Sequence, residues 1–250
     1  MSAGTADGST GQARLEGSGP TRRLTLPVLT EIPGLAHVYT VLGSDEDAVL
    51  AAVTKRRTSL FQLRQVHGAL LHRVEAGESP ASQEHRPSAD ALTTSRRDVA
   101  LGVRVADCVP ILLADPVSGV TGAVHAGWRG TVAGVLRAAI RDLCALGAMA
   151  EDIRVGLGPS IGPCCFEVGD EVVAALRRSD PQASRSILAG VPARIDLIDA
   201  NRRQAIACGI REDHLAATGL CTVCRGDLLE SFRRSRGAPG RMSALIAWRA

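Results

Sequence analysis

The sequence has six histidines and seven cysteines, side chains that bind transition metals or activate a nucleophile, and three of these residues stand out: His67, Cys108 and His125. Two imidazoles and one thiolate suit a borderline-soft ion such as zinc, and three protein ligands leave one tetrahedral position open, as in catalytic zinc sites. The three residues lie far apart in the sequence, and a single cysteine or histidine is more commonly a packed thiol or a hydrogen-bonded surface residue. The pattern therefore predicts a metal site only if the fold brings the three side chains together.

The residues around these three favour the interpretation as a functional site rather than as two ordinary strands. Pro110 has no N–H group, so Cys108 is expected at the start of a strand or at a bulge, where a side chain can be re-aimed. Gly127 and Gly130 flank Arg129 just before a helical pattern, and the first N–H groups of a helix bind anions. We therefore expect Arg129 to hold a phosphate or a carboxylate.

Asp107 is the acidic residue nearest in sequence to a candidate metal ligand. It is a candidate general base, or a partner that orients a ligand of the metal. The alternation of side chains along a strand could equally point it away from the site.

The remaining cysteines give a weaker metal signal. Cys221 and Cys224 have the Cys-x-x-Cys spacing of half a zinc ribbon, which needs a second pair. The adjacent Cys164 and Cys165 are not expected to supply that pair in the same geometry, so packed or locally structural thiols are the favoured interpretation. No partner pattern accompanies the other four histidines: His37, His72, His85 and His214.

The elements expected from hydrophobic periodicity and turn residues would position these side chains. Strands are expected at residues 37–42, 99–105, 109–114, 120–125, 153–157 and 242–248, and helices at residues 45–57, 132–146, 170–178 and 199–208. Strands followed by helices, with hairpin-like turns between many strands, indicate the α+β class with mixed or antiparallel sheets. No Gly-x-Gly-x-x-Gly motif follows a strand, which argues against a dinucleotide-binding fold.

Length and composition predict the domain organisation. The chain has 250 residues, of which 45% are hydrophobic. Residues 1–23 are rich in Gly, Ser, Thr and Ala and are predicted to form a disordered N-terminal tail. Residues 24–250 show no second linker and are predicted to form a single catalytic domain.

Charge and cysteine content argue against some partners and compartments. A net charge of +3 is mild, and we expect no nucleic-acid partner, which would need basic residues concentrated on one face. No apolar run approaches the roughly 18 residues of a membrane helix, so no membrane partner is expected. Seven cysteines, an odd number, without an export signal favour a reducing cytoplasmic location. A monomer or small homo-oligomer is expected.

A series of sequence blocks carries a resemblance to a known family. In chain order they are QVHG at 65–68, ADALTT at 89–94, ADCVPILLAD at 106–115, AVHAGWRGT at 123–131, GPSIGPCCFEVG at 158–169 and the C-terminal CTVC…SFRR…GRMSALI. Over about 190 residues these blocks resemble the YfiH family, also called the multicopper polyphenol oxidase, laccase-domain or peptidoglycan-editing-factor family.

The resemblance implies a four-layer α/β/β/α sandwich, related to cysteine-hydrolase-like folds, and a zinc site of His67, Cys108 and His125. Family members are described as phosphorylases of adenosine, inosine, guanosine and methylthioadenosine, some of which also deaminate adenosine. A purine nucleoside and phosphate would then be the partners. Copper is the less expected metal, because several coppers need many histidines and the sequence has six. The candidate site residues by role are catalytic Cys108, His67, His125 and Asp107, and substrate-binding Arg129, Gln65 and Gly127.

The sequence departs from the family pattern at the rim of the expected site. An Arg-x-Gly-Gly-Val-Ser loop and the Asn-Leu-Gly segment after it are missing between the first strand and the first helix. Val105 replaces the usual threonine, Leu229 and Glu230 replace paired aromatic residues, and Phe232 replaces a tyrosine. These differences suggest a divergent paralogue with altered or reduced activity.

Two rival interpretations remain open. The first is a metal-free cysteine hydrolase or amidase that edits peptidoglycan precursors, with Cys108 as nucleophile and His125 as base. The second is a binding protein that kept the fold and lost turnover, which the missing arginine loop would explain. Metal content and a nucleoside assay separate these interpretations from the phosphorylase.

Overall fold

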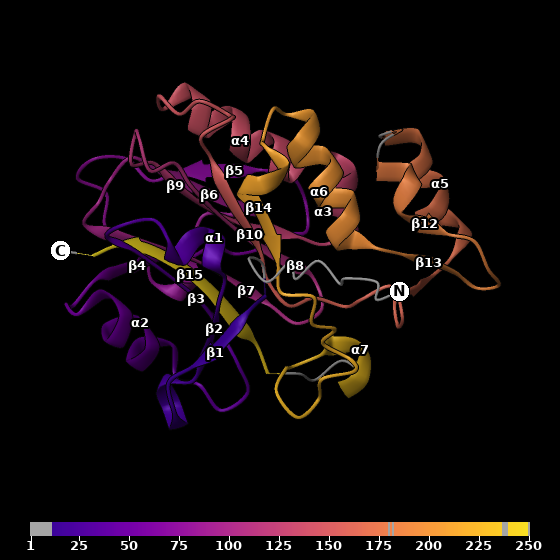
Figure 1. Ribbon diagram of the computed structural model, residues 1–250, viewed down its shortest axis with the longest axis horizontal. Coiled ribbons are helices and arrows are strands. Elements are labelled where there is room, and N and C mark those ends of the chain that lie inside the picture. The colour runs from indigo at the N-terminus through magenta and orange to yellow at the C-terminus, as the bar shows by residue number, and fades with distance from the viewer. Residues whose placement is uncertain (1–11, 180, 182, 237–239, 250) are drawn as a thin grey trace, which may run out of the picture.

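The computed structural model describes residues 12–179, 181, 183–236 and 240–249. Within them, two six-stranded mixed sheets form the body of the molecule (Figure 1). The first sheet runs β1 (Arg14–Glu16), β2 (Arg23–Thr25), β3 (Leu35–Thr40), β15 (Met242–Trp248), β7 (Val99–Val105) and β4 (Ser59–Phe61). The second sheet runs β14 (Leu215–Ala217), β10 (Arg154–Leu157), β8 (Val109–Ala114), β9 (Thr121–Ala126), β6 (Ala91–Thr94) and β5 (Leu71–Arg73).

Strand directions make both sheets mixed. The pairs β4–β7, β10–β14 and β5–β6 are parallel, and the other neighbouring pairs of the two sheets are antiparallel. A third, small sheet runs β11 (Glu167–Val168), β13 (Ala193–Ile195) and β12 (Ile187–Leu188). The predicted α+β class with mixed sheets is confirmed.

Helices are short and lie outside the sheets. They are α1 (Pro27–Thr30), α2 (Glu46–Thr54), α3 (Trp128–Ala133), α4 (Val135–Ala145), α5 (Asp170–Ser179), α6 (Leu197–Ala207) and α7 (Phe232–Ser235). Single 3₁₀ turns occur at Gly19–Thr21, Gln83–His85, Ala183–Ser186 and Glu212–His214. Among the described residues, no helix has the length and apolar character needed to cross a bilayer.

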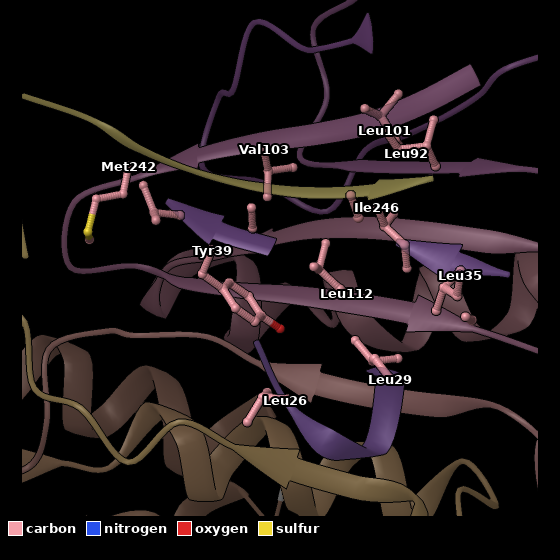
Figure 2. Packing of buried hydrophobic residues seen from close by; sticks show 14 of the residues in the cluster. Leu26, Leu29, Leu35, Tyr39, Leu92, Leu101, Val103, Leu112, Met242 and Ile246 are labelled. Carbon is pink, nitrogen blue, oxygen red and sulfur yellow. The ribbon is translucent and has the colours of Figure 1, made fainter. Parts of the chain in front are cut away.

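The main core lies between the two sheets. Figure 2 shows Tyr39, Leu112 and Ile246, from β3, β8 and β15, converging in this layer. The Tyr39 hydroxyl donates a hydrogen bond of 2.7 Å to the carbonyl oxygen of Gly156 on β10, which joins one sheet to the other. Aliphatic side chains fill most of this layer, as the low aromatic content requires.

Helices cover the outer faces of both sheets. Val49, Leu50 and Val53 of α2 pack on the first sheet, and α4 and α6 pack on the second. Figure 1 shows α2 on one side of the two sheets and α4 and α6 on the other. The apolar residues that the sequence pattern places on one face of each helix are those that make these contacts.

One predicted helix is divided in the structure. The periodicity predicts a continuous helix at residues 132–146, but α3 ends at Ala133 and α4 begins at Val135. Gly134, between them, has a φ of +79°, a left-handed conformation that glycine adopts at no steric cost. The apolar period continues across the break, which is why the sequence does not show it.

The predicted disordered tail is wrong for its last part. Strand β1 pairs with β2, and Leu15 lies opposite Leu24. The Glu16 carboxylate bonds across the pair to the Arg23 guanidinium at 3.2 Å and accepts from the Thr25 hydroxyl at 3.0 Å. Low apolar content concealed this strand, because polar cross-strand bonds hold it. The rest of the predicted tail, residues 1–11, lies outside the described residues.

Candidate active site and metal centre

The fold brings the three candidate metal ligands together. The ligand atoms of His67, Cys108 and His125 all lie within 4.8 Å of one another. His125 is in β9, and Cys108 directly precedes β8, which pairs with β9. His67 comes from the loop between β4 and β5. Its ring meets that of His125 edge-on, with the ring centres 4.8 Å apart.

Gly127 provides the space for the Cys108 sulfur. A Cβ atom at Gly127 would lie 2.9 Å from the Cys108 Sγ and 3.6 Å from Cδ2 of His67. Contacts of 2.9 Å are shorter than real Cβ atoms tolerate, so any side chain here would displace the thiol. Gly127 therefore shapes the site through the absence of a side chain.

Asp90 orients both histidines, and the sequence reasoning did not identify it. Its fully buried carboxylate bonds to Nδ1 of His125 at 2.8 Å and accepts from the backbone N–H groups of His67 at 2.9 Å and Gly68 at 2.7 Å. Burial raises the pKa of Asp90, but these hydrogen bonds outweigh burial and lower it overall. An ionised carboxylate at Nδ1 holds a proton there, so Nε2 is the nitrogen at which a metal would replace the proton of His125.

The backbone at His67 adapts to the same carboxylate. His67 has a φ of +60°, a left-handed conformation that is uncommon for a residue with a side chain. The turn directs successive N–H groups of residues 66–68 at Asp90. Strained backbone of this kind concentrates at functional sites. An acidic residue directly before a buried strand, in ADALTT, was the available sequence signal for Asp90.

The protonation of the cluster favours a thiolate. Burial raises the pKa of the Cys108 thiol, but hydrogen bonds from His125 and His67 lower it, to about 7. Burial lowers the pKa of His125, while its bonds to Asp90 and Cys108 raise it, to about 9. A thiolate next to imidazoles is the form that binds a metal or attacks an electrophile.

Asp107 and Gln65 form hydrogen bonds with neighbouring segments of the chain around the site. One Asp107 carboxylate oxygen accepts from the Thr222 hydroxyl at 2.5 Å and the other from the backbone N–H of Arg233 at 2.7 Å. The Gln65 amide oxygen accepts from the N–H of Arg104 at 2.8 Å, and its Nε2 donates to the carbonyl of the same residue at 2.7 Å. These bonds engage the polar groups predicted to serve catalysis or substrate binding, so both residues position the chain around the cavity.

A cavity of about 740 Å³ lies over the ligand cluster, and His67, Cys108 and His125 are among its lining residues. Its volume is typical of small-molecule sites. Aromatic rings of Trp128, Phe166 and Phe232 also line it. So do five arginines that sequence reasoning missed because they are dispersed along the chain: Arg64, Arg86, Arg104, Arg233 and Arg241.

Arg129 lies beside this cavity. It lines a smaller pocket of about 110 Å³ that shares His67 and Cys108 with the larger one. Its guanidinium carbon is 4.3 Å from the centre of the Trp128 ring, in a cation–π arrangement. The side chain is exposed, so it can reach an anion in the pocket.

Two of the departures from the family pattern reach the cavity surface. Val105 and Phe232 line the cavity, whereas Leu229 is fully buried in the core. Strand β3 ends at Thr40 and α2 begins at Glu46, capped by Asp45, so the connection is short where the family loop is expected.

The cysteine prediction requires a correction. The ligand atoms of Cys164, Cys165, Cys221 and Cys224 lie within 4.8 Å of one another. The adjacent pair was expected not to join the Cys-x-x-Cys pair, and the structure contradicts this. The loop between β10 and β11 folds over the turn after β14, a contact between distant segments that spacing alone does not reveal.

Three of the other histidines are engaged elsewhere. Nε2 of His37 accepts from the Leu26 N–H at 2.8 Å, His72 bonds to Glu78 at 2.7 Å, and Nδ1 of His85 bonds to the Ser82 hydroxyl at 2.8 Å. Of the six histidines of the sequence, only two lie in a metal-ligand cluster of the described residues. This is few for a multi-copper centre.

Comparison with known proteins identifies the family. The family model described as "Multi-copper polyphenol oxidoreductase laccase" matches residues 43–249. The chain belongs to this family. The crystal structure of YlmD from Geobacillus stearothermophilus superposes on this chain with a TM-score of 0.83 at 29% identity, covering 96% of this chain and 100% of that one. The crystal structure of YfiH from Bacillus licheniformis superposes with a TM-score of 0.84 at 27% identity, covering 95% of this chain and 99% of that one.

Curated relatives in this laccase-like family are named as enzymes. "Purine nucleoside phosphorylase YlmD" of Geobacillus stearothermophilus is 39% identical over 198 residues, covering 74% of this chain and 70% of the relative. "Purine nucleoside phosphorylase ORF3" of Streptomyces griseus is 40% identical, covering 74% and 72%. "Adenosine deaminase RL5", from an unknown prokaryotic organism, is 38% identical over 148 residues, covering 58% of this chain and 56% of the relative. The expected family and enzyme status are confirmed.

Proposed function

We propose that this chain is a zinc-dependent purine nucleoside phosphorylase that acts on adenosine, inosine, guanosine and methylthioadenosine, with adenosine deamination as a second activity. The observation that carries the proposal is the convergence of His67, Cys108 and His125 beneath a cavity of about 740 Å³. The names of the curated relatives support the substrate class.

The donor set fits zinc. Two imidazoles and a thiolate within 4.8 Å match a three-ligand catalytic site. Asp90 bonded to the far nitrogen of His125 is the carboxylate partner that such sites use. Zinc held by these residues would supply a Lewis acid that stabilises developing negative charge.

The cavity walls supply recognition of a nucleoside and phosphate. Phe166, Phe232 and Trp128 offer aromatic faces on which a purine can stack. Arg129 and the arginines of the cavity produce a positive potential that attracts phosphate and can hold it by paired hydrogen bonds. Phosphate held there would attack the anomeric carbon of the ribose as the bond to the purine breaks, giving free base and ribose 1-phosphate.

A metal-free cysteine hydrolase is the second candidate. Asp90, His125 and Cys108 form a hydrogen-bonded series of carboxylate, imidazole and thiol, which is also the arrangement of a cysteine nucleophile and its base. A nucleophile needs one imidazole, whereas His67 places a second imidazole at the same point. The second imidazole favours the metal site.

A product assay tests the proposal. Inosine or adenosine incubated with the protein and phosphate should yield free base and ribose 1-phosphate, and omission of phosphate should abolish both products. Cys108→Ala and Cys108→Ser should lose activity together with the metal, because neither side chain replaces the thiolate ligand. Arg129→Ala should raise the phosphate KM, while Arg211→Ala, outside both cavities, should not. Equal base release by wild type and Cys108→Ala would reject the proposal.

A further inference from the structure

Four cysteines gather at a second place in the fold. Cys164 and Cys165 lie in the loop between β10 and β11, and Cys221 and Cys224 lie in the turn after β14. The Cys224 Sγ is 3.6 Å from that of Cys164 and 3.5 Å from that of Cys165. All four sulfurs lie within 4.8 Å of one another.

These separations match a tetrahedral tetrathiolate centre. With metal–sulfur bonds of about 2.3 Å, the sulfurs of such a centre lie about 3.8 Å apart. A disulfide would require about 2.05 Å between two of them. Cys164 and Cys224 are exposed, so apolar packing does not explain why these thiols converge.

The backbone around the sulfurs is arranged for a thiolate cluster. The N–H of Gly162 donates to the Cys221 Sγ at 3.3 Å, the type of bond that stabilises a thiolate ligand. A Cβ at Gly162 would lie 3.3 Å from the Cys164 Sγ and 3.2 Å from Cβ of Cys221. Glycine therefore allows the two loops to approach closely enough for the sulfurs to meet.

Backbone hydrogen bonds hold the two loops together independently of the sulfurs. The N–H of Thr222 donates to the carbonyl of Ser160 at 3.0 Å, and the N–H of Ser160 donates to the carbonyl of Leu220 at 3.3 Å. Within the Cys-x-x-Cys turn, the N–H of Arg225 donates to the Cys221 carbonyl at 3.0 Å. The ligand atoms are thus positioned by the fold before a metal binds.

We propose that Cys164, Cys165, Cys221 and Cys224 bind a second zinc ion, with a structural role. Four thiolates close the tetrahedral shell and leave no position for water or substrate, which is the mark of a structural site. Binding of Zn²⁺ releases the thiol protons, up to four per ion. None of the four cysteines belongs to the cluster of His67, Cys108 and His125.

The second site joins loops that form the active-site wall. Ile161 and Phe166, on either side of the cysteine pair, line both cavities. Thr222, between the other two cysteines, donates to the carboxylate of Asp107, the neighbour of Cys108. The structural zinc would therefore fix the shape of the cavity without contacting a reacting atom.

Zinc content of purified variants tests the proposal, with activity playing no part in the readout. Wild type prepared under reducing conditions without chelator should hold two zinc ions per chain. His67→Ala/His125→Ala should hold one, and so should Cys221→Ser/Cys224→Ser. The matched control, Cys144→Ser/Cys208→Ser, changes cysteines outside both clusters and should hold two. Wild-type zinc content in Cys221→Ser/Cys224→Ser would overturn the proposal.

A spectroscopic measurement covers the case in which the cysteine variant does not fold. The His67→Ala/His125→Ala protein keeps the four cysteines and, loaded with Co²⁺, should show thiolate charge-transfer bands and the intense visible bands of tetrahedral Co²⁺. Their absence would overturn the proposal. A second result would also overturn the proposal: fewer than seven titratable thiols in wild type that is denatured without reduction. At least one of the seven cysteines of the chain would then not be present as a thiol.

Discussion

Asp90 holds two residues of the candidate active site in place. Its carboxylate reaches the side chain of His125 and the backbone of His67, so it orients two of the three proposed metal ligands. It contacts no position that substrate would occupy, because it is fully buried. We therefore regard Asp90 as a positioning residue.

Replacement of Asp90 by asparagine should weaken metal binding. The asparagine amide is neutral, so it accepts a weaker hydrogen bond from the Nδ1–H group of His125 than the carboxylate does. The tautomer and the orientation of His125 are then less well fixed. Zinc affinity should fall by about 10–100-fold, as measured by competition with a chromogenic chelator. Asp142→Asn, which removes a carboxylate bound to Arg73 and Thr93, is the control and should leave zinc affinity unchanged. Equal affinity in Asp90→Asn and wild type would contradict this role.

The two sheets approach each other so closely at the end of β10 that only a residue without a side chain fits there without displacing its neighbours. A Cβ at Gly158 would lie 2.4 Å from the Tyr39 ring and 2.7 Å from Cγ of Pro110. Gly158 also donates its N–H to the Pro110 carbonyl at 2.8 Å, so it cannot move away without losing a backbone bond.

Gly158→Ala should destabilise the protein by about 1–3 kcal/mol, the range for overpacking a filled core. The midpoint of urea denaturation should fall accordingly. Gly68→Ala is a matched control, because its Cβ would meet its nearest neighbour at an ordinary 3.7 Å. A Gly158→Ala midpoint equal to that of wild type would show that the sheets can separate at this point without cost.

Local sequence patterns predicted the strands that position the site well, but they predicted the breaks between elements poorly. Strands at residues 99–105, 109–114 and 242–248 match β7, β8 and β15, since continuous apolar runs between turn residues are typical of buried strands. The break at Gly134 and strand β1 were not predicted. In the first case helical period persists through the break, and in the second polar cross-strand bonds replace apolar alternation.

At the scale of the whole molecule, buried His37 links stability to pH. Burial and the nearby charge of Arg249 lower its pKa to about 3, and its Nε2 accepts from the Leu26 N–H only in the neutral form. The unfolded chain protonates this residue near pH 6.5. The stabilisation is therefore fully present above pH 6.5 and is lost progressively as the pH falls towards 3.

Wild type should lose up to about 1.4 kcal/mol of unfolding free energy per pH unit over this interval, relative to His37→Gln. Glutamine can accept the same hydrogen bond without titrating. Denaturation at pH 7, 6 and 5 measures the difference, and His85→Gln, an exposed histidine, should follow wild type. Parallel pH profiles of His37→Gln and wild type would show that His37 is not the group responsible.

The candidate site could be predicted from the sequence in part. Residue type and the family resemblance selected His67, Cys108 and His125, which the fold brings together. The role of Asp90, the dispersed cavity arginines and the meeting of four cysteines depend on contacts between distant segments. Spacing along the chain carries no information about those contacts until the two sheets are assembled.

We propose that a metal held by His67, Cys108 and His125 supports phosphate-dependent cleavage of purine nucleosides. The most direct test removes zinc with a chelator, returns it in steps, and measures the phosphate-dependent release of hypoxanthine from inosine at each step. Activity should disappear with the metal and return with it in wild type, whereas Cys108→Ala, which keeps the four-cysteine cluster, should stay inactive at every zinc concentration. A zinc-depleted protein that retains the full rate, or a Cys108→Ala variant that matches wild type, would show that the metal is not required for catalysis.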